Sequence, residues 1–493
     1  MKLLKINPAD RVAVALTALS PGDAVTVDGA KIIIGEPITA GHKVALVPIQ
    51  TGEAVLKYGH PIGHATSDIA PGHAVHTHNL KTGLDGLLEY TYTPDRTPLI
   101  PREPGIFQGY RRPNGKVGIR NEVWIVPTVG CVNSTAAYLA EKAGSFLPKE
   151  VEGLYAFPHP YGCSQMTEDH ENTRRALAGL IQHPNAGAVL VLGLGCENNT
   201  VDGMKELLGD YDQERIRFLV TQDCADEYEE GLQILGELVD HAAQFKRESV
   251  PMSELIVGLK CGASDGFSGI TANPLVGSFS DRLIAEGGSA ILTEVPEMFG
   301  AETILMNRCR TPEVFEKTVT LINDFKRYFM ENGQDIYENP SPGNKAGGIS
   351  TLEDKSLGCI QKGGTSDVVA VLGYGDPVTT KGLNLLTGPG NDLVSASSMT
   401  ASGAHLVFFT TGRGTPFGAP VPTVKVSSNT PIYEKKPMWI DFNAGPLLEG
   451  VTLEEMTDAL YEYVRALASG EIKANNEIHN AREFTIFKTG VTL

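Results

Sequence analysis

The chain has 493 residues, enough for two or three domains with cores of their own. Its formal net charge of −18 argues against nucleic acid or an anionic membrane surface as the partner, and no apolar run is long enough to span a bilayer. The first residues lack the apolar core of a signal peptide, and seven cysteines do not indicate a disulfide framework, so we expect a cytoplasmic protein.

Residues 1–95 show short strands and frequent turns without helical periodicity. A pattern of one aliphatic residue, two others, Gly, two others and Val recurs as LSPGDAV, ITAGHKV, IQTGEAV and IAPGHAV. Each copy predicts a tight turn at its Gly that leads into a new strand. The segment is therefore predicted to be a compact all-β module with little core of its own.

This module holds six of the twelve histidines. His76 and His78 lie two residues apart, so in a strand both would face the same side. With His42 from a neighbouring turn they would form a three-nitrogen site suited to Fe, Mn or Zn. The alternative is that the histidines are ordinary surface or hydrogen-bonded residues. Lys43 is a candidate general base or carboxylate anchor, or else an exposed charge.

Residues 96–116 are rich in Pro and Gly and are predicted to be a linker. From residue 117 onward, strand-like runs alternate with helical patterns, which predicts a mainly parallel sheet in an α/β region. We divide this region into a first part, 117–335, and a second part, 336–493, which closes with a helix over 452–469 and a tail. The unpatterned segment 339–366 is predicted to be an active-site loop.

Several apolar strands end in glycine and polar residues, as in AVLVLGLGCENN from Ala188. Because ligands bind at the carboxyl ends of parallel strands, the repetition predicts a single sheet with a polar rim. Five Gly-Cys sites follow this pattern or resemble it: Cys131, Cys163, Cys196, Cys261 and Cys359. Three interpretations stay open for them, namely an iron–sulfur cluster, reactive thiols or small packing residues, and packing is favoured.

Charged side chains in the same loops are candidates for binding an anion or moving a proton. Arg413 lies between two glycines that allow a ligand to approach, while Lys345 and Arg120 have polar neighbours. Each of these cations is otherwise expected to be a salt-bridged surface group. The acids at predicted strand ends are Glu197, Asp265, Glu294, Glu297 and Asp392.

Longer motifs resemble one family. GHKVAL, KYGHPIGHATSDIAPGHAVHTHN, LKCGASDGFSGITANP, NPSPGNKAGGISTLEDKSLGC, FTTGRGTPFG and the terminal FKTGVTL are similar to the altronate dehydratase branch of the altronate/galactarate dehydratase family. The resemblance covers nearly the whole chain. It implies an SAF-type β-clip module, a large α/β catalytic region and dependence on a divalent metal, Fe²⁺ or Mn²⁺. The family's histidine motif falls on His76, His78 and Asn79, and its GHK motif on His42 and Lys43.

The resemblance implies loss of water across C2 and C3 of D-altronate, giving 2-dehydro-3-deoxy-D-gluconate in the breakdown of galacturonate. Removing a proton beside a carboxylate adds a second negative charge, which a metal or cationic donors must stabilise. Our hypothesis places the site between the β-module and the strand ends. It assigns the metal to His42, His76 and His78, substrate binding to Arg120, Lys345, Arg413 and Asn79, and proton transfer to Lys43 or Glu197.

Four alternatives stay open. Galactarate dehydration and sulfite elimination from sulfolactate are related reactions of the same family. An iron–sulfur hydro-lyase would use three of the Gly-Cys thiols. A carbohydrate-binding protein would use the β-module alone. We expect a sugar acid as the small-molecule partner and a homo-oligomer, most simply a dimer.

Overall fold

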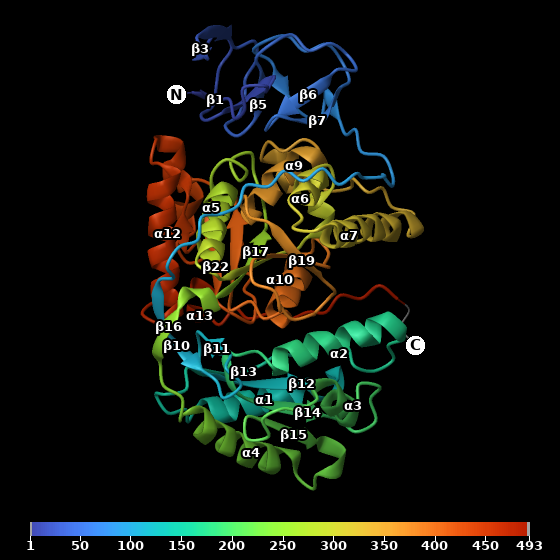
Figure 1. The fold of residues 1–493 in the computed structure, drawn as a ribbon, viewed down its shortest axis with the longest axis vertical. Helices are drawn as coiled ribbons and strands as arrows, with labels where there is room; N and C mark the ends of the chain where they lie inside the picture. Colours follow the sequence, from blue (N-terminus) through green and yellow to red (C-terminus); the bar gives the residue numbers. More distant parts are fainter. Residues whose placement is uncertain (1, 491–493) are drawn as a thin grey trace.

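The computed structural model describes residues 2–490, so the last three residues of the FKTGVTL motif lie outside the described residues. The molecule is elongated, with three bodies in a row (Figure 1). The N-terminal β-module lies at one end, a central domain built on a seven-stranded sheet in the middle, and a lower domain built on a four-stranded sheet at the other end.

The β-module consists of short antiparallel strands, as predicted. Its three sheets have the orders β1-β2-β5-β8, β3-β4 and β6-β7-β9. The strands are β1 Leu3–Leu4, β2 Val12–Ala15, β3 Ala24–Val27, β4 Ala30–Ile33, β5 Lys43–Ala45, β6 Ala54–Lys57, β7 His60–Ala65, β8 Ala74–Val75 and β9 Leu80–Lys81.

The internal repeat explains this fold. The glycines of the four copies, Gly22, Gly41, Gly52 and Gly72, all have φ between +83° and +88°, a conformation that glycine adopts without steric cost. The aliphatic residues that begin the copies are buried and bridge in antiparallel pairs, Leu19 with Ile38 and Ile49 with Ile69.

Much of the module's core is shared with the central domain. Val55 and Ile62 belong to the same buried cluster as Leu352 and Leu357 of the central domain. Thr351 Oγ1 also donates a hydrogen bond to the carbonyl of Ile62 at 2.6 Å. The module is therefore seated on the central domain, as its small size requires.

The predicted linker is only partly irregular. An extended segment runs from the β-module along the central domain (Figure 1), where the hydroxyl groups of Tyr90 and Tyr92 bond Glu302 and the carbonyl of Cys309. Its second half forms β10 Ile106–Arg111, which pairs with β16 Glu248–Pro251, while β11 Val117–Gly118 pairs with β10. The linker prediction for these residues was wrong, because Phe107 and Tyr110 are buried despite the surrounding Pro and Gly.

The α/β region contains two parallel sheets, so the expectation of a single sheet was wrong. The lower sheet has the order β13-β12-β14-β15 and the central sheet the order β19-β20-β18-β17-β21-β22-β23. Strands on both sides of the expected boundary at residue 335 belong to the central sheet, because β17 pairs with β21 through residues such as Val257 and Leu406. The strands are β12 Glu122–Pro127, β13 Gly153–Ala156, β14 Ala186–Gly193, β15 Ile216–Val220, β17 Ile256–Cys261, β18 Ser289–Leu292, β19 Val368–Leu372, β20 Leu383–Leu386, β21 Leu406–Thr411, β22 Thr423–Ser427 and β23 Phe442–Asn443.

The helices predicted from apolar periodicity are present, among them α4 Glu227–Ala242, α7 Pro312–Glu331 and α12 Leu453–Ala468. Segment 339–366, predicted to be a loop, instead contains two short helices and a 3₁₀ turn. The remaining helices are α1 Asn133–Gly144, α2 Thr167–Ile181, α3 Val201–Leu208, α5 Ala272–Ala285, α6 Glu302–Asn307, α8 Pro342–Ala346, α9 Leu352–Cys359, α10 Asp392–Ala401, α11 Thr430–Lys435 and α13 Asn475–Ile478. Among the described residues, no helix is both long and apolar enough to cross a membrane.

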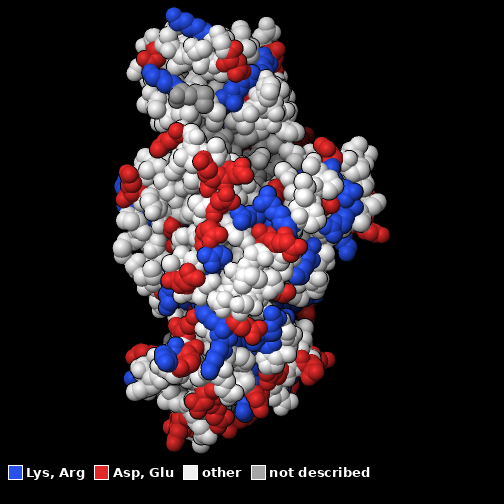
Figure 2. Space-filling model, turned by 60° about the vertical axis from the view of Figure 1, so that its left-hand side comes forward, with Lys and Arg blue, Asp and Glu red and all other residues white. Residues whose placement is uncertain are grey.

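The face shown in Figure 2 carries Lys and Arg side chains interspersed with Asp and Glu. No single extended basic surface is visible on that face.

Candidate active site

The β-module meets the central domain at the carboxyl ends of the central strands. The backbone N–H of Gly266, in the loop after β17, donates to Gly347 O at 2.7 Å, and both residues lie against the turn at Gly41. A Cβ atom on Gly266 or Gly348 would overlap the carbonyl oxygen of Gly41, so glycine is required for this approach. Residues from three distant parts of the sequence are thereby brought together.

A buried cluster of charges joins the module to α9. Lys43 Nζ lies 2.7 Å from Asp354 Oδ2 and 2.7 Å from Gly348 O, and Lys57 Nζ lies 2.9 Å from Asp354 Oδ1. The three charged side chains are at most 3% exposed. Burial lowers the pKa of Lys43 to about 8, although Asp354 opposes the shift. Burial alone would raise the pKa of Asp354, but the two ammonium groups hold it below its usual range.

His42 and His76 form a pair beside this cluster. Their ring centroids are 5.1 Å apart in an edge-to-face arrangement. His76 Nδ1 lies 2.8 Å from Ser350 Oγ, and His42 Nδ1 lies 3.5 Å from Ala40 O. Burial lowers the pKa of both rings, that of His76 to about 4, so both are neutral near pH 7. Within the described part of the chain neither Nε2 atom has a hydrogen-bond partner, so both are free to bind a ligand.

His78 and Asn79 are placed differently from the expectation. His76 to Asn79 lie in a turn after β8, not in a strand, so the argument that His76 and His78 share a strand face was wrong. His78 is exposed. Asn79 Nδ2 donates to Ala74 O at 2.9 Å and its Oδ1 accepts from His76 N at 2.9 Å, so its amide holds the turn that carries His76.

A cavity of about 620 Å³ opens next to this contact, at the strand ends of the central sheet. Lys355, Glu297, Asn344 and Asp392 are among the polar residues that line it. Arg413 and Lys345 lie beside it. Arg413 Nη1 donates to Gly343 O at 3.1 Å, two residues before Lys345, and both cationic side chains are exposed. The structure thus brings these two expected cations together near a polar cavity.

The wall of the cavity contains a network of buried ion pairs. Lys355 Nζ lies 2.8 Å from Glu297 Oε1, Lys260 Nζ lies 2.9 Å from Asp392 Oδ1, and Lys260 also pairs with Glu294. Burial alone would raise the pKa of Glu297, but the charge of Lys355, followed by that of Lys260, lowers it. The network therefore presents the ammonium group of Lys355 and the carboxylates of Glu297 and Asp392 to the cavity.

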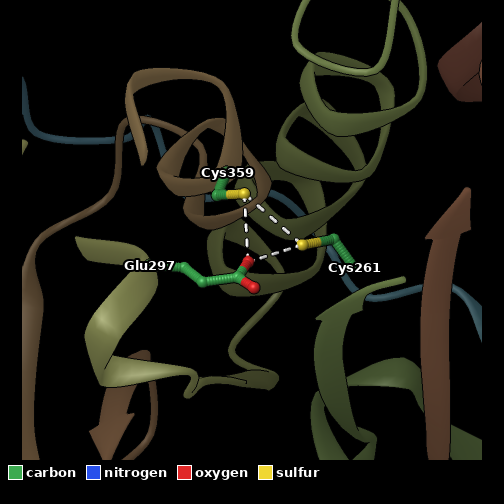
Figure 3. Close-up of side chains that lie close together, drawn as sticks. All are labelled: Cys261, Glu297 and Cys359. Atoms are coloured by element: carbon green, nitrogen blue, oxygen red, sulfur yellow. Dashed lines mark hydrogen bonds between the residues drawn. The ribbon is translucent and has the colours of Figure 1, made fainter. Parts of the chain in front are cut away.

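Two thiols share the carboxylate of Glu297 (Figure 3). Cys261 Sγ, at the end of β17, lies 2.8 Å from Glu297 Oε2, and Cys359 Sγ, at the end of α9, lies 3.3 Å from the same oxygen. The sulfur atoms are 3.4 Å apart. The hydrogen bond with Cys261 and burial raise the pKa of Cys359. Among the described residues this is the one group of three potential metal ligands whose atoms converge within 4.8 Å.

Two expected site residues lie elsewhere. Glu197 follows β14 in the lower domain, at the far end of the molecule from the β-module (Figure 1). Its carboxylate accepts hydrogen bonds from Thr128 Oγ1 at 2.6 Å and from two backbone N–H groups of its own loop. Arg120 is buried and pairs with both carboxylate oxygens of Glu477 at 2.6 and 2.9 Å. Both side chains are engaged within the protein and away from the histidines.

The sequence reasoning missed Asp354, Lys57, Lys260 and Lys355. A signal was present for two of them, because Lys57 and Lys260 lie at the ends of apolar strands, where a buried lysine needs an acidic partner. Asp354 and Lys355 lie in segment 339–366, which was predicted to be functional, but only the fold shows which way each side chain points.

A polar cavity lined by Lys355 and by carboxylates lies next to a β-module that carries two neutral imidazoles. Together they define a site for acid–base chemistry on a small anionic molecule. Comparison with known proteins specifies the class. Family profiles described as altronate/galactarate dehydratase SAF domain, D-galactarate dehydratase/altronate hydrolase second domain, and D-galactarate/altronate dehydratase C-terminal match residues 1–83, 109–243 and 252–492.

Full-length relatives agree. The chain is 54% identical to an altronate dehydratase of Bacillus subtilis (strain 168) over 99% of both chains, and 51% identical to one of Escherichia coli (strain K12) over 100% of both. It is 33% identical to the E. coli galactarate dehydratase (L-threo-forming) over 97% of this chain and 95% of the relative. The chain therefore belongs to the D-galactarate/altronate dehydratase family and is a hydro-lyase, which confirms the resemblance, the SAF-type module and the α/β body.

Proposed function

We propose that the chain dehydrates D-altronate across C2 and C3 to 2-dehydro-3-deoxy-D-gluconate, a step in galacturonate breakdown. The observation that carries this proposal is the higher identity over the full length to the altronate dehydratases than to the galactarate dehydratase. A cytoplasmic location and a dimeric state stay predictions.

Lys43 is the proposed proton-transfer group. The reaction needs a base for the weakly acidic C2 proton, and a base works best when its pKa lies near the working pH. Burial brings the pKa of Lys43 to about 8, and its place beside the histidine pair faces it toward the contact between the domains. Loss of the C2 proton and of hydroxide from C3 gives an enol, which becomes the 2-keto product, and the hydroxide takes up a proton to leave as water.

Lys355 is proposed to stabilise the negative charge that develops on the substrate. It lines the cavity, and its neighbours, above all Glu297, raise its pKa against the effect of burial, so it stays charged. A fixed ammonium group in a partly closed site stabilises an enolate more than water does. Lys345 and Arg413, exposed at the side of the cavity, are the proposed partners of the substrate carboxylate.

Two of the predicted histidine ligands, His42 and His76, are suited to a divalent metal, although the three histidines do not converge as Cys261, Glu297 and Cys359 do. His42 and His76 are neutral, and their Nδ1 atoms face oxygen atoms while their Nε2 atoms are free, as is usual for metal-binding histidines. His78 lies in the same turn as His76 and is the proposed third ligand. A bound Fe²⁺ or Mn²⁺ would supply Lewis acidity toward the hydroxyl and carboxylate oxygens of the substrate.

The Cys261–Glu297–Cys359 group is the second candidate for the metal, because its ligand atoms already converge. Thiolates with a carboxylate suit Fe²⁺ better than Mn²⁺. However, Glu297 is already paired with Lys355, and the raised pKa of Cys359 opposes loss of its proton. These two features favour the histidines.

The test is a product assay with the purified protein and Fe²⁺ or Mn²⁺, comparing D-altronate, galactarate and sulfolactate as substrates. We expect a 2-keto-3-deoxy acid from altronate at a much higher kcat/KM than from galactarate, and no sulfite from sulfolactate. Preferred turnover of galactarate or release of sulfite would refute the proposed substrate.

A further inference from the structure

The lower domain carries a set of cysteines that the proposed reaction does not use. Each of its four parallel strands is followed by a cysteine within seven residues: Cys131 after β12, Cys163 after β13, Cys196 after β14 and Cys224 after β15. The carboxyl ends of parallel strands meet at one edge of a sheet, so the four thiol-bearing loops lie along the same edge. Cys131, Cys163 and Cys196 are exposed, which is unusual for cysteines that serve only for packing.

Hydrogen bonds tie the first three loops together. Gly130 N, next to Cys131, donates to Tyr161 O at 2.9 Å, two residues before Cys163. Asn199 N donates to Gly162 O at 2.9 Å, and Ser164 N donates to Asn198 Oδ1 at 2.8 Å, which links the Cys163 loop to the Cys196 loop. Each of these three cysteines therefore lies within three residues of a bond to a neighbouring cysteine loop.

Cys224, one strand further along the edge, is arranged differently. Its thiol donates to Val220 O at 3.1 Å, within its own loop. Burial and nearby acidic side chains, Glu230 foremost, raise its pKa to about 11. By contrast, Gln222 Nε2 donates to Cys196 Sγ at 3.5 Å, a contact that stabilises negative charge on that sulfur. At this edge, three thiols are therefore exposed and able to bind a ligand, while the fourth, that of Cys224, donates a hydrogen bond within its own loop.

We propose that Cys131, Cys163 and Cys196 bind an iron–sulfur cluster at this edge, with one iron left without a protein thiolate. Iron–sulfur clusters are held by cysteine thiolates. A single zinc ion with Zn–S bonds of 2.3 Å in tetrahedral geometry would need its sulfur ligands about 3.8 Å apart. In the described part of the chain these three sulfur atoms do not all lie within 4.8 Å of one another, which argues against such a zinc site. A cluster in which each iron takes one thiolate does not need its sulfur ligands so close together.

This site is separate from the proposed active site. The lower domain lies at the opposite end of the molecule from the β-module (Figure 1), and Cys261 and Cys359 belong to the central domain. The cluster proposal therefore does not rest on the altronate reaction, and either can fail without the other.

The experiment is anaerobic purification of the full chain after growth with added iron. Iron, acid-labile sulfide, visible absorption and the electron paramagnetic resonance spectrum of the reduced protein would be measured. We expect iron and sulfide in similar amounts in the unaltered protein. Cys131→Ser, Cys163→Ser and Cys196→Ser should each lose the sulfide and the visible absorption. Because all three side chains are exposed, the circular dichroism spectrum should not change.

Cys224→Ser is the matched control at the same edge, and Cys261→Ser controls for the thiols of the central domain. Both should keep the sulfide and the absorption. Iron without sulfide, zinc in place of iron, sulfide retained in the triple variant of Cys131, Cys163 and Cys196, or sulfide lost in Cys261→Ser would each overturn the proposal.

Discussion

Replacing Asp354 with Asn tests the buried charge cluster that joins the β-module to the central domain. In the unaltered protein the carboxylate of Asp354 lies 2.7 Å from Lys43 Nζ and 2.9 Å from Lys57 Nζ. The substitution preserves the shape of the side chain but leaves both ammonium groups without their shared carboxylate. Breaking a buried ion pair by neutralising one partner costs about 3–5 kcal/mol. We expect Asp354→Asn to lower the free energy of unfolding by about 3 kcal/mol or more near pH 7.

The cost should depend on pH in a definite direction. Asp354 raises the pKa of Lys43, so without it the pKa of Lys43 falls below about 8 and the lysine sheds its proton more easily. The penalty should therefore shrink as the pH rises, and the pH at which activity begins to rise should move down.

Urea titrations followed by circular dichroism would measure the effect. Asp28→Asn is the control, because Asp28 is an exposed acid of the β-module that pairs with Lys5 at 3.1 Å. An exposed pair contributes about 1 kcal/mol or less. If Asp354→Asn and Asp28→Asn were equally stable, the buried cluster would not hold the module in place.

Three further outcomes follow from the site. kcat/KM should rise as the pH increases through about 8, the pKa of Lys43, because the base acts in its neutral form. Lys43→Met should abolish turnover. A flat pH profile across this range would contradict the role of Lys43. The double variant His42→Ala, His76→Ala should lose both the Fe²⁺ bound in equilibrium dialysis and metal-dependent turnover, while its circular dichroism spectrum stays the same. If this variant bound Fe²⁺ as before and Cys261→Ser did not, the metal would belong to the thiols. Glu197→Gln should lose about 1–3 kcal/mol of stability. It should keep its kcat, because the carboxylate only accepts hydrogen bonds from its own loop and from Thr128, and a large fall in kcat would return Glu197 to the mechanism.

Local features of the fold could be predicted from the sequence because they depend on nearby residues. The repeated glycine turns of the β-module need positive φ, and the amphipathic pattern of α7 follows from its own apolar spacing. The sequence hypothesis also placed the β-module against the glycine-rich strand ends, and the structure brings the turn at Gly41, next to His42, against Gly266 and Gly348.

Pairings between distant segments could not be predicted in this way. The strand ends before Cys196 and before Gly262 look alike in sequence, yet they belong to different sheets. Glu197 therefore lies in the lower domain and not near the β-module. In the same way, nothing near Lys43 in the sequence indicates that its partner is Asp354, 311 residues away. Arg120 was predicted to bind substrate because its ion-pair partner, Glu477, is likewise far away in the sequence.

A crystal structure with a bound, unreactive analogue of altronate would test the central claim most directly. We expect the analogue in the cavity of about 620 Å³, in contact with Lys355 and extending to His42 and His76 of the β-module. An analogue bound in the lower domain, or one that contacts the central domain at a place remote from the β-module, would contradict it.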